Sequence, residues 1–165
     1  MRYIWLLAIV GLGLCAQAQV KDEIWNALPK CQKVQINVGY DLRIQAFLLN
    51  CETWRIVLGD PAADCTNVEN LQKLVGRPIL VVYVWNISDK GVPYSALNFA
   101  FTQSAKQWDV TLSDVASASG NFLYCFLRPL AILVGYLALP KDLDITKPFR
   151  LWYKDAFGTV GCPSD

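Results

Sequence analysis

The chain has 165 residues, with 15 basic and 14 acidic side chains and no histidine. This near-neutral charge argues against nucleic acid as a partner, because proteins that bind phosphate backbones present a basic face. The absence of histidine removes the most frequent general base and a common zinc ligand, so we expect no metal, no cofactor and no catalytic residues.

The first 18 residues have the organisation of a cleavable signal peptide. Arg2 precedes an apolar run over residues 4–14, and Ala16 and Ala18 supply the small residues of a cleavage site. The run is too short to remain as a membrane-spanning helix. We therefore expect residues 19–165 to form a secreted or periplasmic domain, with no integral membrane segment after cleavage.

Cys15 offers an alternative to simple cleavage, which is lipid attachment and anchoring as a lipoprotein. That processing requires a small residue before the cysteine, and Leu14 occupies the position here. The sequence therefore favours the cleaved form. The mature domain keeps 14 basic residues against 14 acidic ones, since Arg2 is lost, so it has no strong attraction to anionic membranes.

The first half of the mature chain predicts two short helices and a β-hairpin. Apolar residues recur at helical spacing before Pro29 and again before Gly76, whereas alternation on either side of Gly39 is typical of paired strands. The predicted segments are 20–28 (helix), 34–38 and 42–48 (hairpin) and 59–76 (helix), with a further short apolar run at 54–58.

The second half predicts strands separated by turns. The run from residue 78 to 87 is the most strand-like, because it is rich in β-branched and aromatic side chains. Small polar residues at 114–121 indicate a loop, and the tail from residue 158 is rich in turn formers. The other predicted strands are 96–101, 107–112, 122–127, 130–139 and 149–153.

Four motifs in the second half resemble exported bacterial immunoglobulin-like domains of unknown function, of the immunoprotective extracellular antigen type. The resemblance covers about residues 77 to 157, with the motifs in the family's order. One element departs from the family pattern, because Leu130 follows Pro129 where the family has glycine. The motifs are Val84-Trp85-Asn86-Ile87-Ser88, Asn98-Phe99-Ala100-Phe101, Gly135-Tyr136-Leu137-Ala138-Leu139-Pro140 and Phe149-Arg150-Leu151-Trp152-Tyr153.

About eight short strands predict an all-β sandwich or barrel, and the resemblance implies an immunoglobulin-like antiparallel β-sandwich. We expect one such domain over residues 19–165, with one or two short helices. The family's motif is structural and implies no established chemistry.

Tryptophans provide the main candidates for a binding surface. Trp85 and Trp152 lie out of phase with the core-facing residues of their strands, and Trp108 is a third candidate. Exposed aromatic side chains of this kind bind sugars, peptides or protein partners. The alternative is that other segments cover these side chains.

Five cysteines remain after cleavage, so one is left without an intramolecular partner. The first predicted pairs are Cys125–Cys162, which follows if the strands beside them form a hairpin, and Cys31–Cys51, which flank the first hairpin. Cys65 is then the unpaired thiol. Cys51–Cys65 is the alternative pair.

Carboxylate pairs and a glycosylation sequon have structural interpretations. Asp60 with Asp64, and Asp142 with Asp144, fit helix caps and turns better than paired catalytic acids or a calcium site. Asn86 begins an Asn-Ile-Ser sequon but also fits a turn that follows a strand.

The sequence thus predicts a non-enzymatic exported module that binds an unknown protein or glycan partner or has a structural role in the cell envelope. The alternative is an extracellular protease inhibitor that presents the loop at residues 101–107.

Overall fold

The structure is a computed structural model that describes residues 22–118 and 121–162. The predicted signal peptide at 1–18, including Cys15, lies outside the described residues. Within these residues no helix has the length and apolar character needed to cross a membrane. The helices are α2 (Asp22–Ala27), α3 (Cys51–Leu58) and α4 (Thr66–Val75), with 3-10 turns η1 (Lys30–Gln32), η2 (Ala96–Asn98) and η3 (Leu112–Asp114). The strands are β1 (Lys33–Val38), β2 (Leu42–Leu48), β3 (Ile79–Asn86), β4 (Val92–Ser95), β5 (Phe99–Gln103), β6 (Lys106–Asp109), β7 (Val115–Ser117), β8 (Tyr124–Leu127), β9 (Ile132–Ala138), β10 (Phe149–Tyr153) and β11 (Ala156–Val160).

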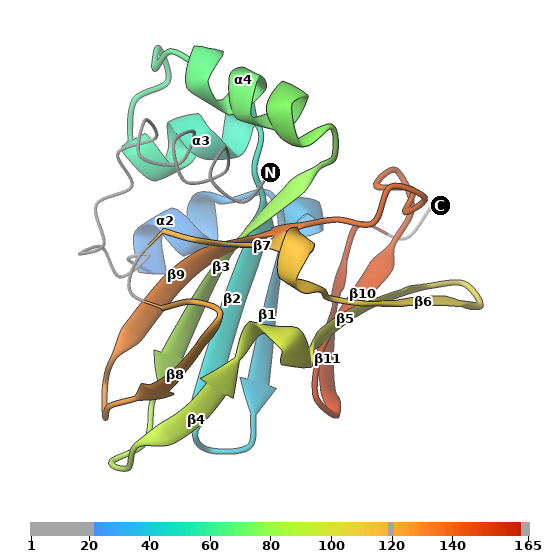
Figure 1. The fold of residues 1–165 in the computed structure, drawn as a ribbon. Helices are drawn as coiled ribbons and strands as arrows, with labels where there is room; N and C mark the ends of the chain where they lie inside the picture. Colours follow the sequence, from blue (N-terminus) through green and yellow to red (C-terminus); the bar gives the residue numbers. More distant parts are fainter. Residues whose placement is uncertain (1–21, 119–120, 163–165) are drawn as a thin grey trace.

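Antiparallel strands form two main sheets and a two-stranded ribbon. The first sheet has the order β1-β2-β3-β9-β7 and the second the order β11-β10-β5-β6, while β4 pairs with β8. Figure 1 shows the ribbon at the end of the molecule away from α3 and α4. This arrangement confirms the predicted β-rich, sandwich-like class, and the predicted hairpin at 34–48 is β1 and β2.

Strand β3 is buried on both faces. Leu80, Val82 and Val84 belong to the core shared with the second sheet and the ribbon. Val81 and Tyr83 belong to a separate cluster with side chains of the helices. A strand between two layers needs apolar residues at consecutive positions, which explains why this run does not alternate.

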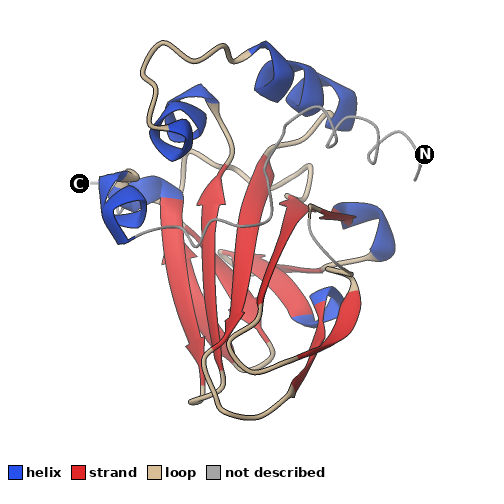
Figure 2. Ribbon diagram, turned by 90° about the vertical axis from the view of Figure 1, so that its left-hand side faces the viewer, coloured by secondary structure: helices blue, strands red, loops and turns tan. Residues whose placement is uncertain are grey.

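Helices pack on the outer face of the first sheet towards one end of its strands, where Figure 2 shows them. Trp54 of α3 and both Val68 and Leu71 of α4 pack against Phe47 and Tyr83 of this sheet. The second sheet has no such helical cover within the described residues. Its outer face is therefore a solvent-facing surface on a rigid support.

Helix α3 contains the apolar run at 54–58, so the described residues hold three α-helices where one or two were predicted. Asn50 accepts a hydrogen bond from the Thr53 backbone N–H, and the Thr53 hydroxyl accepts one from the Asn50 N–H, both at 3.0 Å. This capping box starts the helix, and Gly59 ends it in the left-handed conformation at φ 67°.

Two short strands lie where the sequence predicted loop or turn. Strand β7 pairs with β9 inside the supposed loop at 114–121. Strand β11 extends into the supposed turn-rich tail and pairs with β10. Gly158 suggested a turn, but it is a strand residue beside β1, where a Cβ atom would lie 2.2 Å from Val34 Cγ2. Glycine is required there for close approach of the two strands.

The disulfides are Cys31–Cys162 and Cys51–Cys65, with Cys125 free. The predicted pairs Cys125–Cys162 and Cys31–Cys51 are therefore wrong, and the alternative Cys51–Cys65 is confirmed. Strand β9, which follows Cys125, lies in the first sheet and does not pair with β10, so the expected proximity of Cys125 and Cys162 does not arise.

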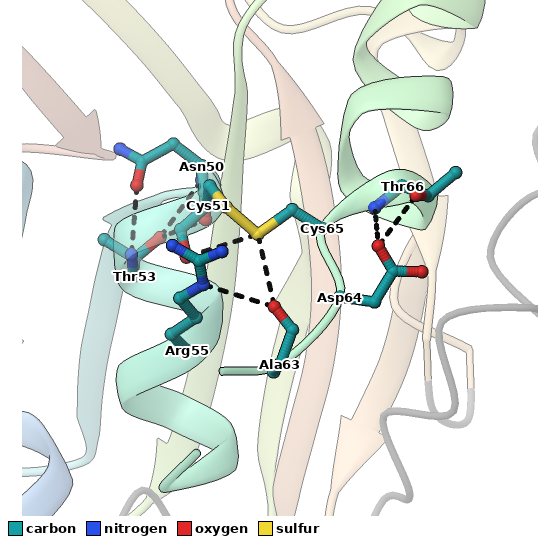
Figure 3. Close-up of a disulfide and its surroundings, with 8 residues drawn as sticks. All are labelled: Asn50, Cys51, Thr53, Arg55, Ala63, Asp64, Cys65 and Thr66. Carbon is teal, nitrogen blue, oxygen red and sulfur yellow. Dashed lines mark hydrogen bonds between the residues drawn. A yellow bond between two sulfur atoms is a disulfide. The ribbon is translucent and has the colours of Figure 1, made fainter. Parts of the chain in front are cut away.

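Each disulfide ties neighbouring elements together. Cys51 is the first residue of α3 and Cys65 precedes α4, so their bond holds the two helices side by side (Figure 3). Cys31 and Cys162 join the segments before β1 and after β11, where the Gly161 N–H also donates to the Cys31 carbonyl at 2.8 Å. Such bonds persist in oxidising compartments, which favours a location outside the cytoplasm.

Candidate functional site

The outer face of the second sheet is the best candidate for a functional surface. Directly opposite residues of antiparallel strands share a face, so the register places alternate residues of all four strands on this side. We call it the open face. Its residues are Ala100 and Thr102 of β5, Gln107 and Asp109 of β6, Arg150 and Trp152 of β10, and Phe157 and Thr159 of β11.

Trp152 lies at the centre of an ordered aromatic cluster on the open face. Its ring centroid is 4.4 Å from that of Phe157, which remains 45% exposed. The Arg150 guanidinium lies 4.6 Å from the centre of the Phe157 ring. The Trp152 indole N–H donates to the Thr102 hydroxyl at 2.9 Å. These contacts hold two large rings and a cation in place without burying them.

A concave region adjoins this cluster and deepens the open face. It encloses about 390 Å³. Thr102, Arg150 and Thr159 belong both to its wall and to the open face, so an apolar platform continues into a polar depression. The other lining residues are Gln103, Ser104, Pro148 and Phe149.

Trp108 lies on the opposite side of the same sheet. It pairs with Phe101, whose side chain is in the core, so Trp108 points inward and is half-buried. It lines a smaller cleft of about 220 Å³ with Arg77, Asp114 and Asp142. The structure therefore separates Trp108 from Trp152, although both were predicted as binding residues.

The Arg77–Asp114 ion pair closes one side of this cleft, with 2.7 Å between Nη1 and Oδ1. Burial of the Asp114 carboxyl favours its neutral form, but hydrogen bonds from Thr111 and the Arg77 guanidinium outweigh burial and hold its pKa below the ordinary value. The pair links the start of β3 to η3 and thereby supports the β7 end of the first sheet.

We expect this ion pair to make stability depend on pH at acid values. The pKa of Asp114 is lowered on folding, so its contribution is complete above the unfolded pKa of about 3.9 and is lost as pH falls through the lower folded pKa. Chemical denaturation of the wild type and Asp114→Asn should therefore converge in stability towards about pH 2. Parallel pH profiles would contradict this contribution.

Trp85 lies on the helix-covered side of the first sheet. Its side chain packs against the cluster beneath the helices, and the Arg43 guanidinium lies 5.9 Å from its ring centre. Trp85 therefore does not share a surface with Trp152 or Trp108. The structure does not bring the three tryptophans together, because the strands that carry them belong to different sheets or their side chains lie on opposite faces.

Three of the four paired carboxylates make the predicted turn and cap contacts. Asp60 accepts from the Ala62 N–H at 2.9 Å, Asp64 from the Thr66 N–H at 3.0 Å, and Asp144 from the Thr146 N–H at 3.0 Å. Among the described residues, no group of three acidic or sulfur side chains is placed to hold a metal ion.

Asn86 has the predicted turn role and is 1% exposed. Its side-chain oxygen Oδ1 accepts a hydrogen bond from the Ser88 backbone N–H at 3.0 Å. Its side-chain nitrogen Nδ2 donates to the backbone carbonyls of Leu127 and Arg128. These bonds fasten the end of β3 to the end of β8. The buried side chain is not presented to a glycosylating enzyme.

The predicted inhibitory loop at 101–107 is mostly strand. β5 and β6 occupy all of it except Ser104 and Ala105, which form a tight turn. The backbone of Ser104 is left-handed, at φ 53°. The segment therefore presents a hairpin tip and not an extended loop.

Phe157 and Arg150 were not predicted as functional residues. Phe157 was missed because β11 was not recognised as a strand. Arg150 could have been found, because the alternation that buries Phe149, Leu151 and Tyr153 places Arg150 on the same face as Trp152. Comparison with protein-family models, curated proteins and solved structures gave no match for this chain.

Proposed function

We propose that the chain is a non-enzymatic, exported binding module that engages a protein partner through the open face, either in the periplasm or after secretion. The observation that carries this proposal is the cluster of Trp152, Phe157 and Arg150 on a sheet face without helical cover. Tryptophan and arginine are the residues most enriched among those that dominate binding energy at protein interfaces.

The surroundings of the cluster support a protein partner. Thr102, Gln107 and Thr159 offer hydrogen-bonding groups around the two rings, as in the polar rim of an interface. The cluster is anchored by the Trp152–Thr102 hydrogen bond, so little side-chain entropy is lost when a partner binds. The adjoining concave region gives a partner side chain a place to insert.

We also propose that the chain is exported and that its fold is immunoglobulin-like. The resemblance to exported immunoglobulin-like domains and the signal-peptide pattern both support export. In an immunoglobulin-like sandwich, strand faces and loops supported by the core are available to binding partners. We therefore place the partner in the cell envelope or the medium.

The test is capture of a partner from the envelope fraction of the producing cell, followed by affinity measurements with the purified partner. Arg150→Glu should weaken binding by at least about tenfold, because it reverses the charge beside the two rings. Arg128→Glu is the matched control, since Arg128 is exposed on the turn after β8 and outside the open face. Equal affinities for the two variants would overturn the proposal. Binding of purified glycans, with no protein partner captured, would replace it with a glycan-binding role.

A further inference from the structure

Strand β8 is an unprotected edge. It pairs with β4 on one side, and no other described strand pairs with its second side. Proteins shield such edges with charges, proline or short length. Edge strand β6 carries Lys106 and Asp109, and β7 has three residues. The sequence of β8 is Tyr-Cys-Phe-Leu, without charge or proline.

Exposed apolar side chains concentrate on and just after β8. Tyr124 is 64% exposed, Phe126 68%, Leu130 79% and Ile132 37%. Tyr124 and Phe126 project from the same face of the strand, because they are two residues apart. Isolated exposed apolar residues are ordinary, but two large exposed rings on one face of a short strand, followed closely by Leu130 and Ile132, are typical of an interaction site.

The hydrogen-bonding pattern fixes which backbone groups of β8 point outward. Pro93 pairs with Phe126 and has no N–H, so this is a non-hydrogen-bonded pair. The Ala96 N–H donates to the Leu123 carbonyl, so bonding to β4 uses residues 123, 125 and 127. The N–H and C=O groups of Tyr124 and Phe126 therefore point away from β4. On that side the Tyr124 N–H donates to the Asn121 side-chain oxygen at 3.3 Å, an exposed bond that pairing with a second strand would replace.

We propose that the chain forms a two-fold dimer in which β8 pairs antiparallel with β8 of a second copy, with the two Cys125 residues opposite each other. In this register Tyr124 and Phe126 of one copy form hydrogen-bonded pairs with Phe126 and Tyr124 of the other. Two aromatic pairs then cover the outer face of the seam. A two-fold axis between the two paired strands, midway between the two Cys125 residues, makes the edge self-complementary, as a symmetric dimer requires.

Cys125 favours a second copy over a foreign strand as the occupant. It is the one free cysteine among the described residues, whose other four are bridged, and an unpaired cysteine of an exported protein is suited to pairing between chains. In the proposed register the two Cys125 residues form a non-hydrogen-bonded pair, with Cα atoms about 4.5 Å apart. That separation lies within the range of about 4.4–6.8 Å that a disulfide spans.

Oxidised glutathione can convert this pair into a disulfide. The Cys125 thiolate attacks one glutathione sulfur, and the other glutathione leaves as a thiolate. The Cys125 thiolate of the second copy then attacks the protein sulfur of the mixed disulfide and releases the second glutathione. Each protein thiol loses one proton to solvent, and the two electrons end on the two glutathione thiols.

The test follows dimerisation of the full mature chain by sedimentation, and cross-linking in a glutathione redox buffer on non-reducing gels. We expect the wild type to give a reducible dimer. Cys125→Ala should lose the cross-link but still sediment as a dimer. Phe126→Lys should weaken dimerisation by at least about tenfold and remain folded by circular dichroism, since the side chain is exposed.

Arg128→Cys in the Cys125→Ala background distinguishes cross-linking within the proposed strand register from cross-linking by random collision of exposed thiols. Residue 128 is exposed, whereas Cys125 is half-buried, so random collisions would cross-link position 128 faster. The proposed register places the two copies of residue 128 far apart, so we expect its cross-linking to be at least about tenfold slower. Faster cross-linking at 128, or a wild type that remains monomeric at all concentrations, would overturn the dimer. Arg150→Glu, which tests the open face, should leave dimerisation unchanged.

Discussion

Replacing Phe122 with alanine is expected to lower the free energy of unfolding by about 3–5 kcal/mol, as measured by chemical denaturation. Phe122 is fully buried, and its ring lies over Gly135 of β9 and 5.5 Å from the ring of Tyr94 in β4. It therefore fills the space between the first sheet and the ribbon. Phe157→Ala, at a position that is 45% exposed, should cost less than about 1 kcal/mol.

Gly135 provides a sharper form of this test. A Cβ atom at Gly135 would lie 2.1 Å from Cγ of Phe122, so Gly135→Ala should destabilise the wild type by pushing the ring away. In the Phe122→Ala background the same methyl group enters an emptied space and should be neutral or stabilising. Additive effects of the two substitutions would show that the ring does not lie over Gly135.

Removing the Cys31–Cys162 disulfide is the second change with a large expected effect. The bond closes a loop with a sequence separation of 131 residues, against 14 for Cys51–Cys65. Chain entropy gives about 3 kcal/mol for a loop of about 15 residues and about 4.7 for about 100 residues. We therefore expect the Cys31→Ala/Cys162→Ala variant to lose more stability than Cys51→Ala/Cys65→Ala, by about 1–2 kcal/mol.

Denaturant titration of the two double variants measures this difference, and peptide mapping under non-reducing conditions checks the pairs themselves. Recovery of a Cys125–Cys162 peptide would contradict the structure directly. A smaller loss from the long loop than from the short one would show that the ends of β1 and β11 are held together by other contacts, such as the bond between Gly161 and Cys31.

Most strands could be predicted because the pattern of apolar residues within each strand reflects how many of its faces are buried. The alternation at 34–38 and at 149–153 follows from one buried face, and the continuous apolar run of β3 follows from burial on two faces. Helix α3 was not distinguished because four apolar residues within the five positions 54–58 suit either a strand or a helix. Asn50, which decides the matter by capping, lies outside the run.

The errors in disulfide pairing and in the tryptophan surface have a common cause. Both depend on which strands become neighbours, and strand order is set by long-range packing that a single sequence does not display. The predicted pair Cys125–Cys162 assumed that β9 and β10 were adjacent, whereas β3 and β7 are the neighbours of β9. The separation of Trp85 from Trp152 follows from the same division into two sheets.

The arrangement of helices and sheets also explains why the open face is left uncovered. Helices α3 and α4 pack against the first sheet through apolar side chains, and the disulfide between Cys51 and Cys65 joins the two helices to each other. The second sheet keeps its outer face in solvent and carries Trp152 and Phe157 on it. Large aromatic side chains on an uncovered sheet are typical of interaction sites, which is the basis of the proposed binding role.

Hydrogen–deuterium exchange of the chain with and without its purified partner tests the binding claim most directly, because it maps the contact without any substitution. Binding through the open face should slow exchange in β10, β11 and β6 and leave α3 and α4 unchanged. Protection confined to the helices or to the β4–β8 ribbon, with β10 and β11 unaffected, would contradict it.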